Sequence, residues 1–254
     1  MKKLDLLIMG DSWGLGEWGG DPVGRYGILH GGLGQYATEA GYAVENISRP
    51  ADCNRSQVDD LLARLERVDL PFPSNIIWFV TDPLRDLQVL SAARVEDDAL
   101  AMFFRSVVDV NDLCKRRDDL LLAQFRRLCH LDIGLLGGPY PIDSHLLSDL
   151  PNLHLVCPNL TQWLAPGSAN ADTAYVTRTW QWRNMARPLW EHYLELEGIG
   201  AEHRHRAEHL VHTPEHRYFW PDGYHINRLA HRRVFVELVL PWLQEPNGNN
   251  DHSA

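Results

Sequence analysis

Short apolar runs alternate with amphipathic helical patterns along most of the chain. Apolar residues recur at helical spacing at Val58, Leu61 and Leu65, for example. Five runs have the length of strands: Leu4–Met9, Ala43–Ile47, Asn75–Val80, Asp132–Leu136 and Leu153–Cys157. Strands separated by helices pair in parallel through right-handed crossovers. The pattern therefore predicts an α/β fold, a three-layer α/β/α sandwich with a central parallel sheet of about five strands.

Helices are expected between these strands and near the end of the chain. The first covers about Gly34–Ala40, and the second starts near Ser56. Residues from about 96 to 130 are predicted to form one long helix or two. The last helix is predicted over Ile226–Leu243, with Leu229 among the residues that face inward.

The domain organisation follows from length and from one irregular segment. A chain of 254 residues suits one α/β domain, which we expect over residues 1–246. Residues from about 161 to 220 fit the alternation poorly and are rich in Trp, Arg and His. They are predicted to form an insertion above the sheet or a helical flap. Residues 247–254 form a polar tail that we expect to be disordered.

The charge balance argues against nucleic acid as a partner. The chain carries 24 Lys and Arg against 34 Asp and Glu, for a net charge of −10. Such a chain repels phosphate backbones, so no nucleic-acid partner is expected. The basic runs Lys115–Arg117 and Arg126–Arg127 lie among helix-forming residues, and we interpret them as solvated helix faces.

The cysteine spacing and the lengths of the apolar runs indicate which cellular location and which cofactors to expect. The four cysteines are far apart and form no C-x-x-C pair, which argues against a zinc knuckle or a redox motif. Leu4–Met9 is interrupted by Asp5 and is too short for the core of a signal peptide. No segment has the length needed to cross a bilayer. We therefore expect a cytoplasmic protein with no membrane partner, no metal and no other cofactor, and the oligomeric state stays open.

Polar clusters follow the ends of three predicted strands. They are Gly10–Trp13, Asn46–Asn54 and Thr81–Pro83, and a fourth cluster, Asp222–His225, opens the last predicted helix. In open α/β sheets, ligands bind at the carboxyl ends of the strands. These clusters are therefore the candidates for a functional site.

Three of these residues have the chemistry of a nucleophilic triad. A serine hydroxyl is a weak nucleophile without a base, and a histidine base needs an acid that fixes its tautomer. Asp222 and His225 lie three residues apart at a helix start, so both can face one cleft. We predict Ser12 as the nucleophile, His225 as the general base and Asp222 as the acid that orients it.

A family resemblance supports the same roles. Gly10-Asp11-Ser12 and Asp222-Gly-Tyr-His225-Ile-Asn227 resemble the first and last motif blocks of the SGNH/GDSL hydrolase superfamily. The order of strands and helices over about 4–157 and 221–243 is also similar. The resemblance implies a flavodoxin-like serine esterase or lipase-like hydrolase. It also implies an oxyanion hole made by the Ser12 backbone N–H, a glycine N–H and an asparagine side chain.

Two positions depart from that family pattern. Aligning Asn46–Asp52 with the second motif block puts Ala51 where glycine is expected. A backbone N–H survives this change wherever the backbone tolerates a Cβ atom. Aligning Phe79–Asp82 with the third block puts Thr81 where the asparagine stands, and a threonine hydroxyl can donate from a shorter side chain.

The predicted oxyanion hole therefore consists of Ser12, Ala51 and Thr81. Asn54 is the alternative side-chain donor. Trp13, Asp82 and Asn54 are predicted to contact substrate. Asp82 is expected to point away from the oxyanion, because an ionised carboxylate would repel it.

Other motifs allow competing interpretations. Gly14–Gly19 fits G-x-G-x-x-G, but its first glycine comes too late after the strand for a dinucleotide fold. Histidines at 203, 205, 209, 212 and 216 resemble a metal-binding run, which Pro214 interrupts. Tryptophans at 163, 180, 182 and 190 are typical of a core, with a sugar or acyl site as the alternative.

The sequence as a whole favours a serine esterase or deacylase that forms an acyl-enzyme on Ser12. The preferred substrate is a small-molecule or carbohydrate ester, with removal of an acetyl or similar short acyl group. Acyl transfer to an alcohol is the first alternative. A catalytically weak glycan-binding module of the same fold is the second.

Overall fold

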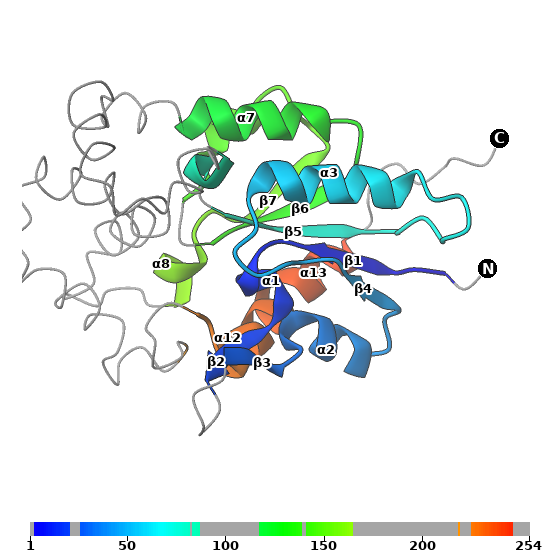
Figure 1. The fold of residues 1–254 in the computed structure, drawn as a ribbon, viewed down its shortest axis with the longest axis vertical. Helices are drawn as coiled ribbons and strands as arrows, with labels where there is room; N and C mark the ends of the chain where they lie inside the picture. Colours follow the sequence, from blue (N-terminus) through cyan, green and yellow to red (C-terminus); the bar gives the residue numbers. More distant parts are fainter. Residues whose placement is uncertain are drawn as a thin grey trace, which may run out of the picture.

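A central sheet of five parallel strands organises the molecule. The computed structural model describes residues 3–20, 26–81, 83–86, 117–138, 141–164, 218 and 225–245. The strands are β1 (Leu6–Met9), β4 (Val44–Asn46), β5 (Ile76–Val80), β6 (Ile133–Gly137) and β7 (Leu153–Cys157) (Figure 1). All five apolar runs of the sequence form strands of this sheet. The predicted α/β class with a parallel sheet is confirmed.

The order of the strands identifies where a ligand would bind. Across the sheet it is β4-β1-β5-β6-β7, so that the first strand of the sheet lies between the second and the third. This is the doubly wound order of flavodoxin-like folds, in which the connections leave in opposite directions after β1 and β5. Ligands in such folds bind at that switch point, outside the carboxyl ends of the two strands. The residues that follow Met9 and Val80 occupy this position.

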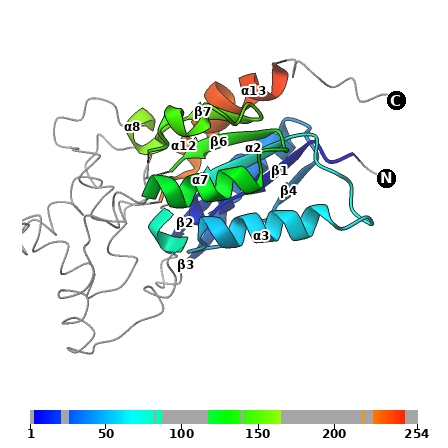
Figure 2. The same cartoon turned by 90° about the horizontal axis from the view of Figure 1, so that it is seen from above.

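Helices cover both faces of the sheet (Figures 1 and 2). One face carries α2 (Gly32–Glu39), α12 (Arg228–Val234) and α13 (Leu240–Gln244), and the other carries α3 (Asn54–Leu65) and α7 (Arg117–Arg127). Leu6 and Ile8 of β1 pack in the first core, and Leu7 and Met9 pack in the second. Because successive strand residues point to opposite faces, a strand covered on both sides is apolar throughout.

Two departures from the sequence pattern lie close to the carboxyl end of β1. A short helix α1 (Ser12–Leu15) follows that strand, and an antiparallel hairpin of β2 (Glu17–Gly20) and β3 (Tyr26–His30) comes next. No strand was predicted from the sequence between Met9 and Ala43. Glycines interrupt the alternation of apolar and polar residues by which a strand is recognised.

The C-terminal helical segment is close to its predicted span. α12, the π-helical segment η4 (Phe235–Val239) and α13 follow one another without a break from Arg228 to Gln244. The prediction that Leu229 faces inward is wrong, because its side chain is 52% exposed. The solvated face predicted for the basic run at 115–117 is also wrong at Arg117, which is buried at the start of α7.

The remaining described elements are η1 (Pro83–Asp86), η2 (Ser144–Leu147) and α8 (Leu160–Leu164). Three predictions fall largely or wholly outside the described residues: the helical region before Arg117, the insertion beyond Leu164, and the tail at 247–254. Among the residues that are described, no helix is long and apolar enough to cross a membrane.

Candidate active site

Ser12 lies at the carboxyl end of β1, as the first residue of α1. Gly10 allows the close approach there, because a Cβ atom at Gly10 would lie 2.7 Å from the Cβ of Phe79. Asp11 caps α1, and its Oδ1 accepts a hydrogen bond of 2.9 Å from the Trp13 backbone N–H. The backbone N–H of a first helical residue has no partner within its helix. Ser12 therefore presents both a hydroxyl and a backbone donor at the switch point of the sheet.

His225 reaches Ser12 from the other end of the chain. Its Nε2 lies 3.0 Å from Ser12 Oγ, across 213 residues of sequence. Ile226, which follows it, is fully buried, and Asn227 caps α12 by accepting from the Ala230 N–H. These anchors hold the histidine just before the helix. A neutral imidazole at this distance can accept the serine proton.

Asp222 lies outside the described residues. Its role as the acid that orients His225 therefore stays a prediction.

The loop after β4 is bound to the segment that carries Ser12. Asn46 Nδ2 donates to the Gly14 carbonyl at 2.8 Å, and the Arg49 N–H donates to the Gly10 carbonyl at 3.1 Å. Ala51, further along this loop, has a φ of 58°. That is the left-handed conformation, which glycine adopts without strain and alanine does not. Ala51 thus has the backbone conformation expected of the glycine in the second motif block.

Thr81 and Asn54 are joined to each other and to Asp11. The Thr81 hydroxyl donates to Asp11 Oδ2 at 2.9 Å. The Asn54 side chain accepts from the Thr81 N–H at 3.0 Å and donates to the Thr81 carbonyl at 2.9 Å. A threonine hydroxyl has only one hydrogen to donate. In this arrangement the hydroxyl of Thr81 is directed at Asp11, and Asn54 supports the backbone of Thr81.

The residues predicted to contact substrate differ in their surroundings. Trp13 is 2% exposed and belongs to the same core cluster as Leu6 and Ile8. Asn54 is fully buried in its contacts with Thr81. Asp82 lies outside the described residues. Contact of these three residues with substrate stays a prediction.

Glu17 and Arg228 are site neighbours that the sequence reasoning missed. Arg228 Nε donates to Glu17 Oε2 at 2.5 Å, joining the start of β2 to the first residue of α12. Only their positions in the sequence could have indicated these two residues. Glu17 follows Ser12 by five residues, and Arg228 follows His225 by three. Glu17 occupies a variable position of the Gly14–Gly19 match, and Arg228 directly follows the block that ends at Asn227.

His231, one turn further along α12, is a second histidine close to the site. The Leu33 N–H donates to its Nδ1 at 3.3 Å, and burial lowers the pKa of His231 to about 4. This imidazole is therefore neutral at physiological pH, with its proton on Nε2. Within the described part of the chain, no group of three or more His, Cys, Asp or Glu residues could hold a metal ion. The histidine run at 203–216 lies outside that part.

Comparisons with known proteins add little to this geometry. No protein-family model matches the chain, and no curated protein is similar enough in sequence to match it. Among solved structures, the crystal structure of TesA is similar over 94% of this chain and 98% of that chain, with 14% sequence identity and a TM-score of 0.37. A similarity of that size carries no information about the activity of this chain.

Proposed function

We propose that this chain is a serine hydrolase that cleaves ester bonds through an acyl-enzyme on Ser12. The observation that carries the proposal is the 3.0 Å contact between Ser12 Oγ and His225 Nε2. It lies at the switch point of a flavodoxin-like sheet, where such folds bind their ligands.

Each step of the proposed reaction uses these two side chains. His225 Nε2 takes the hydroxyl proton as Ser12 Oγ attacks the ester carbonyl carbon. The protonated imidazole then gives that proton to the departing alkoxide, which leaves as an alcohol. His225 next deprotonates a water molecule that attacks the acyl-enzyme, and it then returns this proton to Ser12 Oγ as the acid is released. Asp222 would fix the tautomer of His225 throughout.

Two backbone N–H groups are the proposed oxyanion donors. The Ser12 N–H begins a helix, and the Ala51 N–H belongs to a loop that is bound to the segment of Ser12. Thr81 was the predicted third donor, and its hydroxyl donates to Asp11. We therefore assign Thr81 to holding Asp11, and through it the cap of α1. A hole with two donors is weaker than one with three, since one donor contributes about 3 kcal/mol in other hydrolases.

A short-acyl ester of a carbohydrate is the preferred substrate, on the resemblance and the aromatic-rich segment at 161–220. Acyl transfer to an alcohol uses the same acyl-enzyme, so product analysis with and without an added alcohol separates it from hydrolysis.

A panel of p-nitrophenyl esters and acetylated sugars tests the proposal. Wild-type protein should release acid from short-chain esters. Ser12→Ala and His225→Ala should reduce turnover by at least about a thousandfold. Ser148→Ala, on an exposed serine of another loop, should match wild type. Equal turnover by wild type and Ser12→Ala, or no turnover of any ester, would contradict the proposal.

A further inference from the structure

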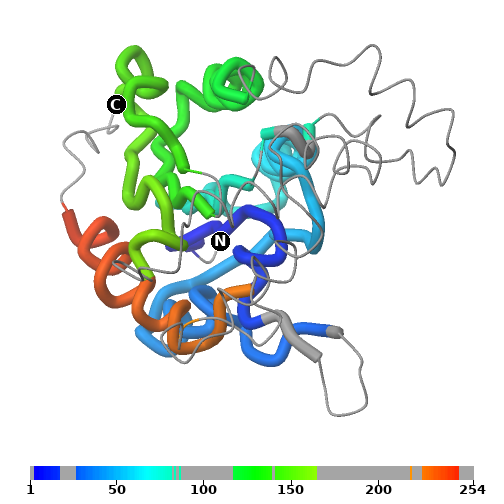
Figure 3. The backbone as a smooth tube through the Cα atoms, turned by 90° about the vertical axis from the view of Figure 1, so that its left-hand side faces the viewer, coloured from blue at the N-terminus to red at the C-terminus, as the bar shows by residue number. Residues whose placement is uncertain are grey.

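Ser12 and His225 belong to segments that are far apart in sequence. Their contact therefore requires other interactions that hold the two segments in a fixed relative position. Ser12 belongs to the segment that continues through Gly16 into β2, and His225 belongs to the segment that enters α12. Figure 3 shows the orange start of α12 beside the blue N-terminal segment. Reacting groups need tight placement, since a shift of about 1 Å costs about a hundredfold in rate.

Two side chains of α12, one turn apart, make the connection. Arg228 forms the ion pair with Glu17, and His231 accepts from the Leu33 N–H at the start of α2. Gly32 packs closely against both His231 and Gly16, because a Cβ atom there would lie 2.5 Å from Gly16 Cα and 2.9 Å from the His231 ring. α12 therefore packs directly against the segment at Gly16 and Glu17, which follows Ser12.

The ion pair is asymmetric in its burial. The side chain of Glu17 is 4% exposed, whereas that of Arg228 is 50% exposed. A carboxylate this deeply buried needs a cation or several hydrogen-bond donors beside it. Arg228 is the cation that the described residues provide, so the charge of Glu17 fixes where the first turn of α12 lies.

We infer that Glu17 and Arg228 are positioning residues, whose ion pair sets the Ser12–His225 geometry from outside the reacting atoms. This inference rests on the proposed function. Because Glu17 is five residues beyond the nucleophile and Arg228 three residues beyond the base, the pair fixes both partners at once.

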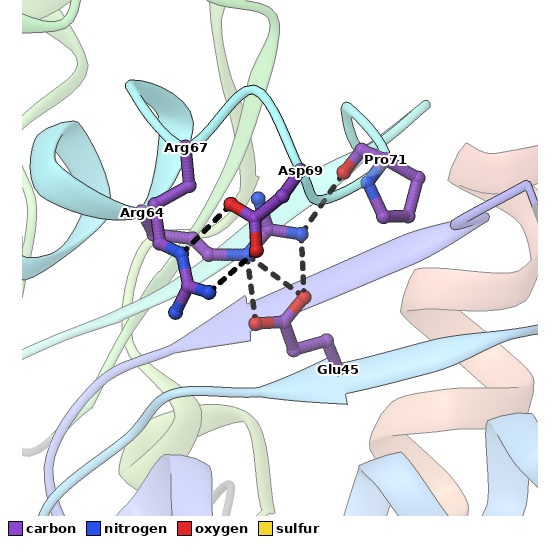
Figure 4. Close-up of polar contacts among 5 residues, drawn as sticks. All are labelled: Glu45, Arg64, Arg67, Asp69 and Pro71. Carbon is purple, nitrogen blue, oxygen red and sulfur yellow. Dashed lines mark hydrogen bonds and ion pairs between the residues drawn. The ribbon is translucent and has the colours of Figure 1, made fainter. Parts of the chain in front are cut away.

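The matched control is a similar ion pair away from the two reacting side chains. Arg64 of α3 donates through Nε and a terminal nitrogen to Glu45 of β4, and also to the Pro71 carbonyl (Figure 4). Here too one partner is buried, since the Arg64 side chain is 7% exposed. Neither residue contacts Ser12 or His225.

The experiment measures kcat, KM and the melting temperature of Glu17→Gln, Arg228→Gln, Arg228→Lys, the double Gln variant and Glu45→Gln. Active sites are counted by titration with a fluorophosphonate, so that kcat refers to reactive protein. Glu17→Gln should lower kcat about tenfold with KM nearly unchanged, and the double variant should lose no more than the worse single variant.

Two further results distinguish positioning from a purely structural role. Arg228→Lys should recover most of kcat, because it restores the cation. Arg228→Gln should lower the melting temperature more than Glu17→Gln, because it leaves a buried carboxylate without its cation. Glu45→Gln should lower the melting temperature with kcat unchanged.

Wild-type kcat in Glu17→Gln, additive losses in the double variant, or an equal loss in Glu45→Gln would overturn the inference. Absence of labelling and turnover in wild type would instead overturn the proposed function on which it rests.

Discussion

Acidification is expected to destabilise this fold through His231. The imidazole lies fully buried between α12 and the first residues of α2, with its Nδ1 accepting from the Leu33 N–H. Protonation would place a charge in a fully buried site, and it would also block the Nδ1 acceptor. Burial therefore lowers the pKa of His231 from 6.5 to about 4.

The magnitude follows from proton linkage. The unfolded chain binds a proton at this histidine near pH 6.5, but the folded chain does so only near pH 4. The neutral imidazole therefore contributes its full stability above pH 6.5, and that contribution is lost as the pH falls through this window. At about 1.4 kcal/mol per unit of pKa shift, the total loss is about 3 kcal/mol.

Urea unfolding followed by tryptophan fluorescence at several pH values between 7.5 and 4 measures this loss. His231→Asn keeps an acceptor, Oδ1, at the position of Nδ1 and removes the titrating group. Its free energy of unfolding should be lower at pH 7.5 and should fall about 3 kcal/mol less on acidification than that of wild type. The control is His130→Asn, on an exposed histidine, which should follow the wild-type pH dependence. Parallel pH profiles for wild type and His231→Asn would refute the reasoning.

Three further predictions concern the site. Ala51→Gly should raise the free energy of unfolding, measured in urea titrations, by about 0.5–1 kcal/mol. Glycine relieves the backbone strain at a φ of 58°, and the greater entropy of the unfolded glycine chain offsets part of this gain. Thr81→Val should lower kcat less than tenfold, as expected for loss of the bond to Asp11; a loss of about a hundredfold or more would make the Thr81 hydroxyl an oxyanion donor. Asp222→Asn should keep the melting temperature and lower kcat strongly through misorientation of His225, and unchanged steady-state kinetics would remove Asp222 from the triad.

The strands β1, β5 and β6 could be predicted because burial on both faces leaves a continuous apolar run. β7 has the bounds expected from the sequence, Leu153–Cys157, and β5 begins one residue later than expected. The β2–β3 hairpin could not be predicted, since its strands contain Gly19, Gly20 and Gly27 and show no clean alternation. The prediction that Leu229 is buried failed for a different reason. An apolar residue at helical spacing can still face solvent.

The candidate site was predictable in its residue types but not in its connections. Serine, histidine and aspartate chemistry points to Ser12 and His225 without any structure. The direction of the Thr81 hydroxyl depends on Asp11 in three dimensions. The Glu17–Arg228 pair joins residues 211 positions apart through the seating of α12, and neither residue stands out in the sequence.

The most direct measurement is mass spectrometry of the protein after treatment with a fluorophosphonate. Such probes modify a serine only when a neighbouring base has activated its hydroxyl. Wild type should gain one adduct, and peptide mapping should place it on Ser12. His225→Ala should label far more slowly, and Ser12→Ala should not label at all. An adduct on another residue, or folded wild-type protein that does not react, would contradict the assignment of Ser12 as the nucleophile.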